Sequence, residues 1–79
     1  MPRGRKRLDR SELICRIRAL MADRPARTAP PLQRAEWLER KARVYDDVAR
    51  VDRAVSREAR ILAAKARLEA SVLRAGDAL

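Results

Sequence analysis

The chain has 79 residues, with 20 Lys and Arg against 11 Asp and Glu, no histidine and a formal net charge of +9. Seventeen of its basic residues are arginines, whose planar guanidinium groups bind phosphate or carboxylate through two donors at once. One cysteine and no histidine exclude a Cys–His pair, an ordinary zinc site and an internal disulfide. We therefore expect a non-enzymatic protein with no metal or cofactor, which its charge draws to polyanions.

The length indicates a single domain with a thin core, which dimerisation would help to stabilise. No apolar run reaches the about 18 residues of a membrane-spanning helix, so we expect no membrane partner. The single cysteine favours a reducing compartment. The expected location is the cytoplasm, at the nucleoid if the protein is bacterial.

Residues 1–8 are expected to form a disordered basic arm, because they lack apolar periodicity and include Arg3, Arg5, Lys6 and Arg7. Within the arm, Pro2-Arg3-Gly4-Arg5 resembles the core of the AT-hook, in which glycine lies flat in the DNA minor groove and the arginines point inward. The chain departs from that motif at Lys6, where the AT-hook has proline. Two other interpretations are a solvated tail that keeps the protein soluble and, in a eukaryote, a nuclear import signal.

A first helix is predicted over about residues 10–23. Asp9 and Glu12 have the spacing of a capping box, and Leu8 with Leu13 has that of a hydrophobic staple. Residues at helical spacing form an apolar stripe, namely Leu13, Ile14, Ile17, Leu20 and Met21. Pro25 ends this helix, and a proline-stiffened linker over 24–30 carries Arg24 and Arg27.

A second helix is predicted over about residues 31–52, with Pro31 as its first residue. Its apolar residues form two neighbouring lanes, the first being Trp37, Val44, Val48 and Val51 and the second Leu38, Ala42, Tyr45 and Ala49. Three acid–base pairs at i,i+4 spacing are expected to support this helix, namely Glu36–Arg40, Glu39–Arg43 and Asp46–Arg50.

A third helix is predicted over about residues 56–75, capped by Ser56 and stopped by Gly76. Its expected apolar face consists of Ile61, Leu62, Ala66, Leu68, Val72 and Leu73. The helical phase also continues across 52–56, so that one helix of about 43 residues is the alternative. We favour a turn, because Asp52 and Ser56 compete for helical hydrogen bonds and a hairpin buries its own stripes.

The predicted fold is all-α, either a small three-helix bundle or a helical hairpin with a preceding helix, in one domain over residues 9–76. Charge is uneven, since residues 1–10 carry net +4 and residues 24–34 net +3. We therefore expect a DNA-binding accessory or regulatory protein that contacts phosphates through Arg3, Arg5, Lys6, Arg7, Arg10, Arg24 and Arg27. The alternative is a helical protein-interaction module, such as an antitoxin-like protein, a scaffold or a regulatory subunit, with its partner on the apolar helix faces.

Overall fold

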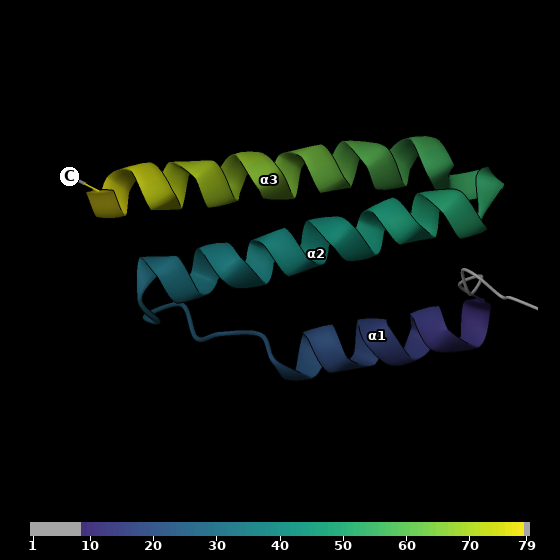
Figure 1. The fold of residues 1–79 in the computed structure, drawn as a ribbon, viewed down its shortest axis with the longest axis horizontal. Coiled ribbons are helices and arrows are strands. Elements are labelled where there is room, and N and C mark those ends of the chain that lie inside the picture. The colour runs from purple at the N-terminus through teal and green to yellow at the C-terminus, as the bar shows by residue number, and fades with distance from the viewer. Residues whose placement is uncertain (1–8, 79) are drawn as a thin grey trace, which may run out of the picture.

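Three helices lie side by side in the computed structural model, which describes residues 9–78 of the chain (Figure 1). They are α1 (Arg10–Ala22), α2 (Pro31–Val51) and α3 (Ser56–Ala78), and a short 3-10 turn, η1 (Arg53–Val55), joins the last two. The middle helix, α2, runs antiparallel to both neighbours. No Cα atom of α1 approaches one of α3 within 8 Å. The all-α prediction of a helical hairpin with a preceding helix is confirmed.

The start of α1 is fixed by the predicted capping box. The Asp9 carboxylate accepts a hydrogen bond from the Glu12 backbone N–H at 2.8 Å, and the Glu12 carboxylate accepts one from the Asp9 N–H at 3.4 Å. These two bonds satisfy backbone donors that have no partner within the helix. Leu8 and the predicted basic arm lie outside the described residues.

The turn between α2 and α3 is also as predicted, and the single long helix is excluded. Asp52 has an extended backbone, with φ −123° and ψ 102°, and its carboxylate accepts a hydrogen bond from the Ala54 N–H at 3.1 Å. An aspartate side chain that bonds the backbone two residues ahead favours a turn over a continuing helix.

Two details of α3 differ from the prediction. Ser56 has φ −56° and ψ −45°, which are helical angles, so it begins the helix without being its N-cap. Gly76 does not stop α3, which continues to Ala78. No described glycine has a positive φ, and the left-handed conformation that makes glycine a stop signal is therefore not adopted at this position.

The two predicted lanes of α2 pack against different neighbours. The first lane, with Trp37 and Val44, forms one cluster with Leu13 and Leu20 of α1, and Val48 and Val51 pack against it. The second lane packs against α3, where Ala42 clusters with Ala63 and Ala66 and is flanked by Leu38 and Tyr45. Leu38 lies between the lanes and packs against both clusters. A wide apolar face on α2 is thus divided between two partner helices.

The buried face of α3 corrects the prediction, because it consists of alanines. Small residues let two helix backbones approach closely, and the buried ones here are Ala59, Ala63, Ala66 and Ala70 on α3 with Ala35, Ala42 and Ala49 on α2. Of the six residues predicted for this face, Ala66 alone is fully buried. Ile61, Leu68 and Val72 are 59%, 65% and 63% exposed.

The stripe of α1 is likewise only partly used. Leu13 and Leu20 are buried against α2, whereas Ile14, Ile17 and Met21 are exposed. One short helix that touches a single neighbour can bury only a narrow line of side chains, and α1 has α2 as its sole neighbour among the described elements. None of the described helices is long and apolar enough to cross a membrane.

Candidate nucleic-acid interface

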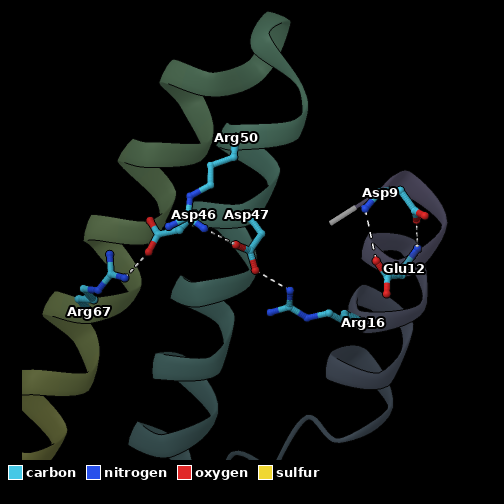
Figure 2. Close-up of polar contacts among 7 residues, drawn as sticks. All are labelled: Asp9, Glu12, Arg16, Asp46, Asp47, Arg50 and Arg67. Carbon is cyan, nitrogen blue, oxygen red and sulfur yellow. Dashed lines mark hydrogen bonds and ion pairs between the residues drawn. The ribbon is translucent and has the colours of Figure 1, made fainter. Parts of the chain in front are cut away.

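Several arginines are used to hold the helices together. Arg16 of α1 pairs with Asp47, and Arg67 of α3 pairs with Asp46. Figure 2 shows that these adjacent aspartates of α2 point to opposite sides of the helix, one toward each neighbour. Consecutive residues on a helix lie about 100° apart, so neighbouring carboxylates can serve two interfaces.

Other ion pairs replace those predicted within α2. Glu39 is bound by Arg74 of α3 through two hydrogen bonds, of 2.8 and 2.9 Å. Arg40 binds Asp23 at the end of α1 at 3.2 Å, and Arg50 binds Asp47 at i,i+3 spacing, also at 3.2 Å. None of the three predicted i,i+4 pairs forms an ion pair in the described chain.

The two-pronged contact with Arg74 changes the acidity of Glu39. The hydrogen bond from the guanidinium lowers the pKa of the carboxyl below its ordinary value, and the charges of Arg74 and Arg43 lower it further. The same hydrogen bond raises the pKa of Arg74, and a bond to Asp46 raises that of Arg67. The Glu39–Arg74 pair is therefore charged on both sides near neutral pH.

The end of the molecule where the chain enters α1 is rich in unpaired arginines. We call it the arm end and define it as Asp9, Arg10, η1 and the first turns of α3, which lie at the same end of the molecule with the end of α2 between them (Figure 1). Arg10 and Asp52 approach to only 3.8 Å, and the Arg10 side chain is 73% exposed. Within the described part of the chain, Arg53, Arg57 and Arg60 have no acidic partner and are exposed.

The predicted phosphate-binding residues do not form one surface. Arg10 lies at the arm end, whereas Arg24 and Arg27 lie in the linker at the opposite end of α1 (Figure 1). The 13 residues of α1 separate the two groups by about 20 Å. Arg3, Arg5, Lys6 and Arg7 belong to the arm, outside the described residues.

The linker arginines have a different environment from those of the arm end. The Arg24 guanidinium lies over the Trp37 ring, 5.7 Å from its centroid, and the Lys41 ammonium is 5.4 Å from the same centroid. The indole of Trp37 is itself buried, and its Nε1–H donates to the Leu20 carbonyl at 2.8 Å. Trp37 is therefore a core residue, in keeping with its place in an apolar lane of α2.

Sequence reasoning missed Arg53, Arg57 and Arg60. Acids and bases balance over residues 35–58, which hides Arg53 and Arg57, and Arg60 lies just beyond this stretch within a predicted helix. Asp46, Asp47 and Glu39 bind arginines of α1 and α3. The sequence did contain a signal for these interhelical ion pairs. The second predicted helix carries carboxylates on both of its flanks, from which they can reach two neighbouring helices.

The described residues contain no group of three metal-ligating side chains, and Cys15 is exposed. Searches with protein-family models, against curated proteins and against solved structures gave no significant match.

Proposed function

We propose that this protein is a non-enzymatic accessory or regulatory protein that binds the phosphate backbone of DNA with its arm end and basic arm. The observation that carries the proposal is the set of exposed arginines at the arm end that have no acidic partner in the described part of the chain. Exposed arginines of this kind can settle on phosphates and release condensed counterions, which is the main source of affinity for duplex DNA.

The arm strengthens this proposal through its charge. Residues 1–8 add four bases and no acid, and they enter the described chain at Asp9, beside Arg10. Phosphate contacts position a protein on DNA without reading its sequence. The expected behaviour is binding with little sequence preference, apart from any preference for A·T-rich minor grooves that Arg3 and Arg5 provide. The proposal includes dimerisation and a location in the cytoplasm, at the nucleoid in a bacterium.

Binding to a short DNA duplex, measured by fluorescence anisotropy across a series of salt concentrations, tests the proposal. About 4–6 phosphate contacts predict a slope of log affinity against log salt of about −4 to −5. Substituting Arg53 and Arg57 together by alanine should flatten the slope by about 2 units, because each contact contributes about 0.9. Replacing Arg3 and Arg5 should have a similar effect.

A matched control is Lys65→Ala, which removes an exposed positive charge from the middle of α3, away from the arm end. We expect the control to leave the slope within about half a unit of the unaltered protein. Absence of binding at low salt, or an equal change in the control and in the arm-end variants, would refute the proposal. The same titration on RNA identifies the preferred nucleic acid.

A further inference from the structure

A groove of about 530 Å³ opens between the linker, α2 and α3, at the end of the molecule opposite the arm end. We call it the linker groove. Its apolar surface includes Leu38 of α2 with Leu68, Val72 and Leu73 of α3. Aliphatic side chains are usually inside a protein, and Leu68 and Val72 are exposed although Ala66 and Ala70 beside them are buried. An exposed aliphatic strip that lines a groove is typical of a surface that binds another molecule.

The rim of the linker groove is positively charged. Four bases line it, and Glu69 is the single acidic residue among them. The four are Arg24, Arg27, Arg34 and Lys41, and none of them pairs with an acid in the described part of the chain. Arg24 and Lys41 instead lie over the Trp37 ring. These cation–π contacts hold the two side chains in place without neutralising their charges.

The groove is about one and a half to two helical turns long. Its α2 side runs from Arg34 to Lys41, and its α3 side runs from Leu68 to Leu73, which corresponds to about 10 Å along α2 and about 8 Å along α3. Two antiparallel helices that expose apolar side chains into a shared groove accept a third helix through residues at i, i+3 or i+4, and i+7.

We propose that the linker groove binds an amphipathic, acidic helix of a partner protein. The aliphatic side of that helix packs on Leu68 and Val72, and its carboxylates lie against Arg24, Arg27 and Lys41. Charge complementarity identifies the partner, because unpaired arginines beside an apolar strip select carboxylates that flank apolar residues. This inference concerns a surface separate from the arm end and does not depend on DNA binding.

Two other occupants fit the groove less well. A second copy of this chain carries +9 itself, so that its approach to a positive rim is opposed by like charges. A nucleic acid would meet an aliphatic strip with no exposed aromatic ring, because Trp37, the one aromatic residue lining the groove, is buried. Bases stack on exposed aromatic faces, and such a face is missing from the described lining.

The test uses a synthetic peptide of about 16 residues, or four helical turns, with leucines at i, i+3, i+4 and i+7 and glutamates on both flanks. Trp37 is the sole tryptophan of the chain and lines the groove, so its emission reports binding to the full-length protein. We expect a saturable change in emission with the glutamate peptide. A peptide with the same leucines and lysine in place of glutamate should give none.

Matched variants locate the binding surface. Leu68→Glu places a negative charge on the apolar strip and should weaken peptide binding by about tenfold or more. Ile61→Glu makes the same kind of change on α3 at a residue that is similarly exposed but does not line the groove, and should leave the affinity unchanged. Both side chains are exposed, so each variant should fold, which circular dichroism would check.

Three results would overturn the inference, namely no saturable signal with the glutamate peptide, equal binding of the lysine peptide, or equal losses for Leu68→Glu and Ile61→Glu. Direct binding of duplex DNA that is lost in Leu68→Glu and kept in Ile61→Glu would also overturn it, because that result would assign the groove to nucleic acid. Replacing Arg53 and Arg57 by alanine should leave peptide affinity unchanged, which separates this result from the outcome of the DNA experiment.

Discussion

The two sides of α2 are packed in different ways. Toward α3, the contact consists of small alanines with two arginine–carboxylate pairs, Arg67–Asp46 and Arg74–Glu39, beside it. Toward α1, the contact consists of large side chains, namely Leu13, Leu20, Trp37 and Val44, with an indole hydrogen bond from Trp37 and the Arg16–Asp47 ion pair in its middle. Two exposed ion pairs, Arg10–Asp52 and Arg40–Asp23, lie at its two ends. One interface depends on close backbones and the other on a few bulky residues.

This difference indicates which part of the molecule is the framework. The alanine contact extends along two helices of 21 and 23 residues, whereas α1 has 13 and a helix that short is marginal on its own in water. Segments with few buried apolar contacts open at lower free energy than the rest of a protein. We therefore expect the α2–α3 hairpin to stay folded when α1 detaches.

The largest effect is expected from enlarging the alanine contact. Replacing Ala63 and Ala66 together by leucine forces the two backbones apart and should destabilise the protein by about 2–6 kcal/mol, because overpacking costs about 1–3 kcal/mol per site. That loss is comparable to the whole stability of about 4–12 kcal/mol expected for this length. Urea unfolding followed by circular dichroism measures it.

The control for this prediction is the same double change at Ala64 and Ala75, which are exposed on the same helix. Exposed substitutions of this kind change stability by about 0.5 kcal/mol or less per site. Equal unfolding midpoints for the two double variants would show that the alanines are not the basis of the contact between α2 and α3.

A smaller and more local effect is expected at the α1 interface. Leu20→Ala removes a buried side chain from the cluster with Trp37 and Val44, and such truncations cost about 2–5 kcal/mol. Because α1 can detach while the α2–α3 hairpin stays folded, the substitution should lower the stability of the hairpin by less than this amount. Native-state hydrogen exchange should show faster exchange at α1 amides, with protection in α2 and α3 retained.

Met21→Ala is the matched control, because Met21 is the next residue of α1 and is exposed. Its amide exchange should resemble that of the unaltered protein. If Leu20→Ala instead lowers protection equally in all three helices, the molecule unfolds as one unit and the distinction between framework and attached helix is wrong.

The same distinction explains how far the sequence predicted the fold. Helix limits were predictable within a few residues, because Asp9, Pro31 and Asp52 act through local backbone geometry that leaves a sequence signal. The buried face of α3 was not predictable from hydrophobicity, which favours Leu68 over Ala66. Small residues are buried where two helix backbones lie close together. How closely they lie depends on both helices, so the sequence of α3 by itself does not show it.

The candidate site was predictable only in its charge. A surplus of arginine is visible in the composition, but pairing decides which arginines remain available. Arg10 and Arg24 were both expected to contact phosphates, and the fold places them at opposite ends of α1. Arg57 was overlooked because acidic residues in the same stretch of sequence balance its charge. In the structure one of those acids, Asp46, binds Arg67 of α3 instead. Pairing between helices that are distant in sequence has no local pattern.

The smallest expected effect concerns the Glu39–Arg74 pair, which flanks the alanine contact in an exposed position. Arg74 lowers the pKa of Glu39 in the folded protein below the ordinary value of 4.5. The pair's contribution to stability is therefore complete above the unfolded pKa and is lost as the pH falls through the lowered, folded one. Urea midpoints of Glu39→Gln should lie slightly below those of the unaltered protein at neutral pH and converge with them in acid.

The control is Glu69→Gln, an exposed change on α3 at a residue with no ion pair in the described chain, and its urea midpoints should show no such convergence. High salt should shrink the difference between Glu39→Gln and the unaltered protein, because exposed ion pairs are screened. A gap between the Glu39 variant and the unaltered protein that persists at the lowest pH would mean that the pair acts through packing of its methylene groups, since charge cannot contribute once the carboxyl is protonated.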